Sequence, residues 1–237
     1  GTGDDAVSVT LALDAQQGEV TRASGNLTLD AFGFFQASGD FGIDKRDGSV
    51  TLADLPSTTG TDESATPVAV SQLLIGGHDL AAFVGVNGGQ ANATGLALSG
   101  VEFGLALQTE RLTQQQQDQH QQAREWATLQ ASVGSAGFVG MDGLTLSVDT
   151  LQVDINRAAG DGTVIDYADG ATALTLTTGP ASSLTLDVAG DQGALVRASG
   201  HVNLDLYGFV QLEGNLAFEK AEAVQTVKLS DGTEAHT

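Results

Sequence analysis

The stretch RASGNLTLDAFGFFQASGDFGIDK, residues 22–45, recurs in similar form near the end of the chain. The second copy reads RASGHVNLDLYGFVQLEGNLAFEK, residues 197–220, and aligns without a gap at an offset of 175 residues (197 − 22). The match extends upstream, where SVTLALDAQQG from Ser8 aligns with SLTLDVAGDQG from Ser183. The chain therefore contains a repeat of the size of a whole domain.

Alternating side chains within the first copy predict β-strands. Small or apolar residues alternate with polar ones before Phe32-Gly33, which breaks the phase, and the alternation then resumes. Asp47-Gly48 is a favoured pair for a two-residue hairpin turn. We therefore predict an antiparallel meander of strand, glycine corner, strand, Asp-Gly turn and strand.

The same alternation fills most of the remaining chain and defines the fold class. We expect an all-β protein, an elongated antiparallel meander built from long strands, with a short strand at residues 163–167. Shifts of the alternation at Gly100 and near Asp149-Thr150 predict β-bulges. The polar stretch from Pro56 to Pro67 predicts a surface loop.

The repeat sets the domain organisation. Residues 1–175 are expected to be one full repeat unit, and residues 176–237 the start of the next unit. Since the chain starts within the unit, we expect neighbouring units to share one continuous β architecture that hides strand edges.

One compositional outlier interrupts the strands. Residues 113–122 read TQQQQDQHQQ, and glutamine is a fair helix former. This stretch has no apolar stripe to hold a helix against the protein. We expect an exposed excursion, with one short helix near residues 111–130 or no regular structure.

Charge excludes two classes of partner. The formal net charge is −21, from nine Lys and Arg against 30 Asp and Glu. Such a surface repels phosphate backbones and anionic lipids, so we expect neither nucleic-acid binding nor membrane insertion. The chain has no Cys, which rules out disulfides and thiolate chemistry.

Several repeat segments are similar to tandem modules of giant secreted or cell-surface bacterial proteins of the adhesin-like kind. They are residues 22–45, AFVGVNGG at residues 82–89, GLALSGVEFGLAL at residues 95–107 and SAGFVGMDGLTLSVDTLQVDINRA at residues 135–158. The resemblance implies an extracellular or cell-surface location and a structural or adhesive role. It implies no catalytic residues.

Catalytic patterns are absent from the sequence. His78, beside Asp79, is the histidine best suited to catalysis or ligation, and Asp149 with Asp154 is a candidate carboxylate pair. No nucleophile elbow, HExxH motif, P-loop or GxGxxG motif accompanies them. We therefore expect a non-catalytic protein.

Calcium is the one cofactor that the residues suggest. Asp161, Asp166 and Asp169 cluster around two Asp-Gly pairs, and hard cations prefer several oxygen ligands. Asp-Gly pairs are equally common in hairpin turns, so turn formation explains the same residues. We keep these three aspartates as the candidate metal ligands.

Two further expectations concern function. Arg22 and Arg197 are rare cations at equivalent places, and we expect each to bind a carboxylate or strand-end carbonyls. The unit as a whole is expected to be a non-catalytic stalk or spacer that partners neighbouring units of its own chain. The alternative is a β module that binds a glycan, calcium or an apolar ligand; aromatic residues make up only 5% of the chain, which disfavours a sugar platform.

Overall fold

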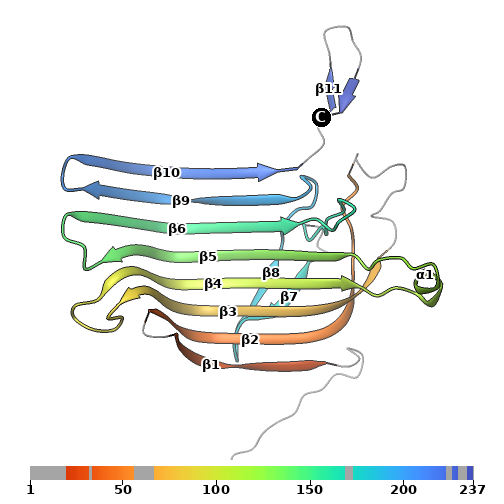
Figure 1. Ribbon diagram of the computed structural model, residues 1–237, viewed down its shortest axis with the longest axis horizontal. Helices are drawn as coiled ribbons and strands as arrows, with labels where there is room; N and C mark the ends of the chain where they lie inside the picture. Colours follow the sequence, from red (N-terminus) through yellow and green to blue (C-terminus); the bar gives the residue numbers. More distant parts are fainter. Residues whose placement is uncertain are drawn as a thin grey trace, which may run out of the picture.

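The computed structural model describes residues 20–31, 34–55, 67–168, 173–222, 226–228 and 234–236. Eight strands form one antiparallel sheet in the order β1-β2-β3-β4-β5-β6-β9-β10 (Figure 1). The strands of this sheet are β1 (Thr21–Ala31), β2 (Phe35–Val50), β3 (Val68–Val86), β4 (Thr94–Glu110), β5 (Glu125–Val139), β6 (Leu144–Arg157), β9 (Leu195–Leu206) and β10 (Val210–Ala221). The prediction of an all-β antiparallel meander built from long strands is confirmed.

Smaller elements complete the described fold. β7 (Leu174–Thr177) pairs with β8 (Ser183–Leu186), and β11 (Thr226–Lys228) pairs with β12 (Glu234–His236). The single helix of the described residues, α1 (Gln114–Asp118), lies in the glutamine-rich excursion, as predicted. No helix among the described residues is long and apolar enough to cross a membrane.

The two repeated hairpins form opposite borders of the sheet. β1–β2 and β9–β10 have the same register: Arg22 faces Asp44, and Arg197 faces Glu219, at the 175-residue offset (197 − 22 and 219 − 44). β1 and β10 are the outermost strands, while β9 pairs along its other side with β6. The hairpin that opens the second copy is thus hydrogen-bonded to the last long strand of the first copy.

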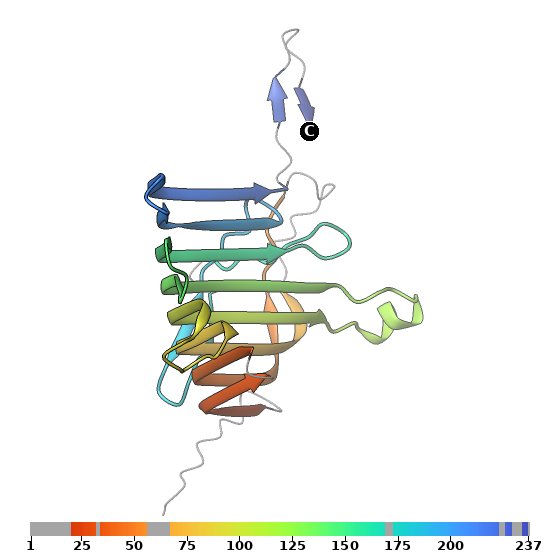
Figure 2. The same cartoon turned by 60° about the vertical axis from the view of Figure 1, so that its left-hand side comes forward.

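A row of glycines brings the β7–β8 hairpin onto one face of the sheet. Gly42, Gly76 and Gly104 face one another across β2, β3 and β4. A Cβ atom at Gly76 would lie 2.5 Å from the Thr177 carbonyl oxygen, and one at Gly104 would lie 2.9 Å from Leu184 Cδ2. Glycine therefore permits the close approach that places the hairpin across these strands (Figures 1 and 2).

The hydrophobic core lies on this covered face. Its buried members are Val50, Leu52, Val70, Leu74, Ala106, Trp126, Ala159, Ile165, Tyr167, Leu176 and Leu186. The polar groups of its two large aromatic residues are paired, since Tyr167 donates to Gln108 Oε1 at 2.8 Å and the Trp126 indole donates to the Thr163 carbonyl at 3.1 Å. We call this side of the sheet the covered face.

Two local predictions are wrong. Asp47-Gly48 forms no turn and lies inside β2, opposite Ser71 and Val70. A Cβ atom at Gly48 would overlap the Gln72 side chain, so this glycine makes room for a buried neighbour on β3 rather than for a turn.

The predicted strand at residues 163–167 is reduced to one isolated bridge between Ile165 and Leu52. Side chains take the carbonyls that a longer ladder would use: Trp126 binds the Thr163 carbonyl and Asn156 binds the Ile165 carbonyl. The segment is therefore fixed in the core by these side chains together with backbone hydrogen bonds to Thr51, Ala53 and Val188.

Both predicted bulges are confirmed. The β6–β9 register shifts between Asp149 and Gln152, with Thr150 at φ 55°, and Gly100 at φ 59° interrupts the pairing of β4. The loop predicted from Pro56 lies outside the described residues up to residue 66.

Adding a methyl group to the glycine row should loosen the β7–β8 hairpin. We expect Gly76→Ala to lower the free energy of unfolding by about 1–3 kcal/mol, because the methyl group meets backbone and side-chain atoms of Leu176, Thr177 and Thr178. The matched control is Gly25→Ala on β1, where a Cβ atom meets nothing within 4 Å. That change should be neutral or stabilise by up to about 1 kcal/mol, measured by denaturant unfolding. Equal effects of the two variants would contradict the close approach.

Candidate functional site

The first candidate site is the repeat boundary, where side chains reinforce both copies of the hairpin. Arg22 Nη2 donates to Asp44 Oδ2 at 2.7 Å, and at the equivalent position Arg197 Nε donates to Glu219 Oε2 at 2.8 Å. The prediction that both arginines bind a carboxylate is confirmed.

Two more equivalent pairs follow along each hairpin. The first copy pairs Asn26 with Asp40 at 3.1 Å and Gln36 with Asp30 at 3.0 Å, and the second pairs His201 with Asn215 at 3.1 Å and Gln211 with Asp205 at 2.9 Å. The Gln211 amide, with the Gly208 backbone N–H, holds the pKa of Asp205 below its usual range. The glutamine–aspartate pair is the same in both copies, and the other pair changes from Asn and Asp to His and Asn at the same positions.

The surroundings of the arginine pair differ between copies. The Asp44 side chain is 2% exposed, and Arg46 Nη1 lies 3.6 Å from its Oδ2 atom, whereas the Glu219 side chain is 48% exposed. β2 has β3 beside it and contacts the β7–β8 hairpin, while β10 is the outermost strand of the sheet. The first pair is therefore a partly buried ion pair, and the second is a surface ion pair.

This difference predicts that replacing the arginine by alanine destabilises the chain more in the first copy than in the second. Arg22→Ala should destabilise the chain by about 1–3 kcal/mol, because it removes hydrogen bonds to a buried carboxylate. Arg197→Ala should cost less than about 1 kcal/mol, because Glu219 is solvated. Thermal and urea unfolding of both variants checks the ordering, and a larger loss for Arg197→Ala would contradict it.

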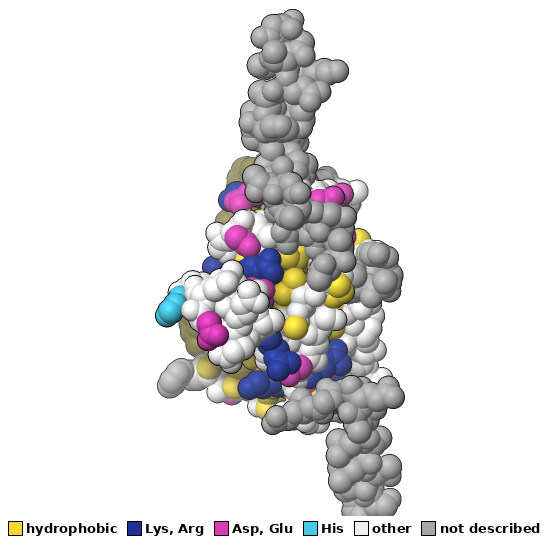
Figure 3. All heavy atoms as spheres, turned by 90° about the vertical axis from the view of Figure 1, so that its right-hand side faces the viewer, with side chains coloured by type: hydrophobic (Ala, Val, Ile, Leu, Met, Phe, Trp, Pro, Cys, Tyr) yellow, Lys and Arg dark blue, Asp and Glu magenta, His cyan; other side chains and the backbone are white. Residues whose placement is uncertain are grey.

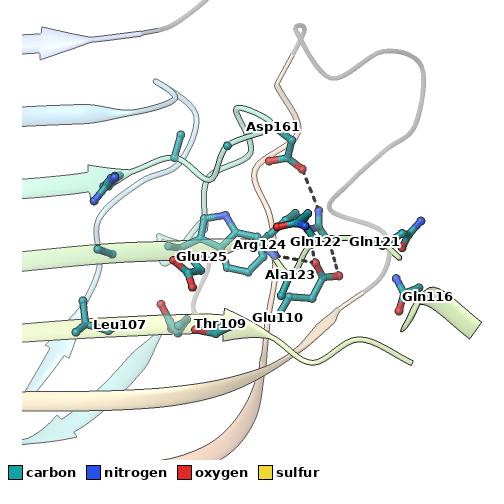
Figure 4. Close-up of a pocket in the computed structure, with 16 residues that line it drawn as sticks. Leu107, Thr109, Glu110, Gln116, Gln121, Gln122, Ala123, Arg124, Glu125 and Asp161 are labelled. Atoms are coloured by element: carbon teal, nitrogen blue, oxygen red, sulfur yellow. Dashed lines mark hydrogen bonds and ion pairs between the residues drawn. The ribbon is translucent and has the colours of Figure 1, made fainter. Parts of the chain in front are cut away.

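The second candidate site is an open cavity of about 1020 Å³ at one end of the strands, between β4, β5 and the α1 excursion (Figure 4). Figure 3 shows Lys and Arg side chains at this end of the molecule, close to Asp and Glu side chains. Arg124 donates two hydrogen bonds of 2.8 and 3.0 Å to the Glu110 carboxylate, and its Nη1 atom lies 3.7 Å from Asp161 Oδ2. These three charged side chains of the cavity wall therefore form ion pairs with one another.

Arg124 has two further effects on this cavity. It holds the pKa of Glu110 below its ordinary value near 4.5, so the ion pair stabilises the fold above that pH and is lost as the pH falls through the lowered pKa. The guanidinium also lies 5.2 Å from the Trp126 ring centroid, and Trp126 is only 2% exposed. The single tryptophan is therefore not available to stack on a sugar.

One polar atom beside the cavity lacks a partner among the described residues. Gln108 is buried, its Oε1 atom accepts from Tyr167, and its Nε2 atom makes no hydrogen bond. Around it the cavity is lined by amides of Gln116, Gln121 and Gln122. This is the chemistry of a polar ligand site.

The two predicted calcium ligands that the structure describes, Asp161 and Asp166, accept hydrogen bonds from other groups of the chain. Asp161 Oδ1 accepts from the Thr163 hydroxyl at 2.7 Å and backbone N–H at 3.1 Å. Asp166 Oδ1 accepts the backbone N–H groups of Ala168 and Gly190, both at 3.0 Å. Asp169 lies outside the described residues. Across the described ranges no group of three or more His, Asp or Glu side chains is placed to hold a metal, and the calcium site stays a prediction.

The residues considered for catalysis lie apart from the cavity. His78 Nδ1 is 3.1 Å from Glu102 Oε1, with both side chains partly exposed on neighbouring strands. Asp149 faces Ser135 and His201 at the β6 bulge, whereas Asp154 faces Gln130 and Arg197. Burial raises the pKa of Asp154. Neither arrangement brings a nucleophile to a base.

Comparisons with known proteins leave these sites without a precedent. A scan against protein-family models, a search of curated proteins and a search of solved structures each found no match. Sequence reasoning missed the cavity because its residues come from distant segments, and it missed the glycine row because strand register alone aligns Gly42, Gly76 and Gly104.

Proposed function

We propose that this chain is a non-catalytic structural unit, a stalk or spacer of a longer extracellular bacterial protein. The observation that carries the proposal is the pairing of β9, the first strand that the second copy adds to the main sheet, with β6 of the first copy. The repeat boundary is thereby an ordinary strand pair inside one sheet. Repetition of the unit would extend that sheet instead of adding separate domains.

The geometry gives the growth per unit. Each 175-residue repeat contributes β1 to β6 to the main sheet, and β9 then takes the place of β1. At a strand spacing of about 4.8 Å, six strands extend the sheet by about 29 Å. Backbone hydrogen bonds across every boundary suit a spacer, because they resist bending between units.

The proposal includes an extracellular location. The resemblance to adhesin-like repeat modules, the net charge of −21 and the lack of Cys all agree with it. Under this proposal the partners of the unit are neighbouring units of the same protein. Binding to a cell or surface is the task of other segments of that protein.

The second candidate function is a ligand-binding module, favoured by the cavity with the unpaired Gln108 amide. A glycan is the ligand class that amides such as Gln116 and Gln122 would bind. Burial of Trp126 weakens this reading, since the usual aromatic platform is missing. A ligand-binding module could instead bind calcium at Asp161 and Asp166, or an apolar ligand.

The test is to lengthen the chain and measure its shape. Residues 47–221 are appended once or twice after Ala221, since Ala221 is the equivalent of Arg46 at the 175-residue offset (221 − 46). Small-angle scattering should show the length growing by about 29 Å per added unit at constant cross-section. Growth as flexibly linked globules would contradict the proposal. A saturable thermal shift with one glycan or with calcium would favour the binding module.

A further inference from the structure

The sheet has a second face that no described element covers. Side chains alternate in direction along each strand, so the neighbours of the glycine row point the opposite way. There the paired positions form one transverse row of Ile43, Ile75, Leu105, Leu129, Ile155 and Val196. We call the side of the sheet that carries this row the apolar face.

The apolar face continues toward the far end of the strands. Phe35, Val84 and Leu96 form part of a parallel row, and on β10 Leu212 and Leu216 are 46% and 52% exposed. Leu80 lies on this side too, against the positions of Gly39 and Gly77. The β7–β8 hairpin and the segments around Leu52 and Ile165 pack on the covered face. An exposed apolar surface this extended marks an interaction surface.

Its dimensions suit a stable protein interface. Eight strands spaced about 4.8 Å apart span about 34 Å, and about ten residues of each strand span about 33 Å. The product is a projected area of about 1,100 Å², compared with the roughly 800 Å² per partner of a standard interface. Two twisted sheets of the same hand pack face to face about 10 Å apart, as in β-sandwiches.

Charges of both signs border the apolar face at the strand end nearest the cavity. By the same alternation, Lys45, Arg157 and Lys220 lie there together with Asp47 and Glu125. Arg111 Nη1 lies 2.7 Å from Asp47 Oδ2, and Lys220 Nζ lies 3.5 Å from Glu222 Oε1. These charges are therefore largely matched within one copy, and association through the face rests on its apolar side chains.

We propose that the apolar face binds the same face of a second copy of this chain to form a two-layer sandwich. This interaction is separate from growth of the sheet through its edge strands. It would join two spacers side by side and remove their apolar faces from water.

The test is the oligomeric state of the whole chain by sedimentation velocity across a concentration series. Leu98 and Leu146 lie on the apolar face, because Leu98 follows Leu96 by two residues on β4 and Leu146 pairs with Leu204, which faces Leu212 on β10. We expect a dimer, and Leu98→Glu with Leu146→Glu should weaken it by about 100-fold, because two carboxylates from each copy would be buried in an apolar interface. The control is Ser147→Glu with Gln152→Glu, which adds the same two charges on the opposite side of β6 and should leave the dimer within about threefold. Circular dichroism and thermal unfolding verify that both variants keep the fold.

Two outcomes would contradict the proposal. A monomer at all concentrations, or an equal loss of dimer in the control variant, would overturn it. Sheet growth measured on lengthened chains is unaffected by any of these outcomes, so the two proposals fail separately.

Discussion

The pairing of β6 with β9 is the interaction on which the rest of the architecture depends. It runs from Leu144 opposite Leu206 to Asn156 opposite Leu195, with one bulge between Asp149 and Gln152. Without it, the β9–β10 hairpin would be a two-stranded ribbon, which is marginally stable in water. With it, the hairpin becomes part of an eight-stranded sheet, and the repeat boundary has the same hydrogen-bonded geometry as the interior.

The long connection between β6 and β9 explains how one sheet can grow by whole units. Within that connection, β7 and β8 cross onto the covered face and contribute Leu176 and Leu186 to the core. The glycine row lets them lie close enough to bury those side chains. The first unit thus supplies six strands, and the β7–β8 hairpin at its junction with the second unit covers part of them. The opposite face stays apolar and uncovered by described elements.

Much of this fold could be predicted from the sequence, because period-two alternation and a gapless repeat are local or nearly local signals. They placed the long strands, the bulges at Gly100 and Thr150 and the pairing of Arg22 and Arg197 with carboxylates. The predicted turn at Asp47-Gly48 was wrong because the sequence of an Asp-Gly pair does not show which role its glycine has. Here Gly48 makes room for the Gln72 side chain instead of turning the chain.

The candidate sites were less accessible to sequence reasoning. Arg124, Glu110 and Asp161 meet only because α1 is an excursion between paired strands and the segment after β6 folds back over the core. The apolar face was hidden for a related reason. Alternation shows that each strand has an apolar side, but only the register shows that these sides join across the sheet and that the core lies on the other one.

The most direct test of the account is amide hydrogen exchange of the whole chain, resolved to individual strands. If the sheet is continuous across the repeat boundary, the amides of β9 that pair with β6 should be protected to the same degree as those of β5, and the outward-facing amides of β10 should exchange fast. Fast exchange throughout β9, with protection ending at β6, would show that the second copy does not join the sheet and would contradict the account.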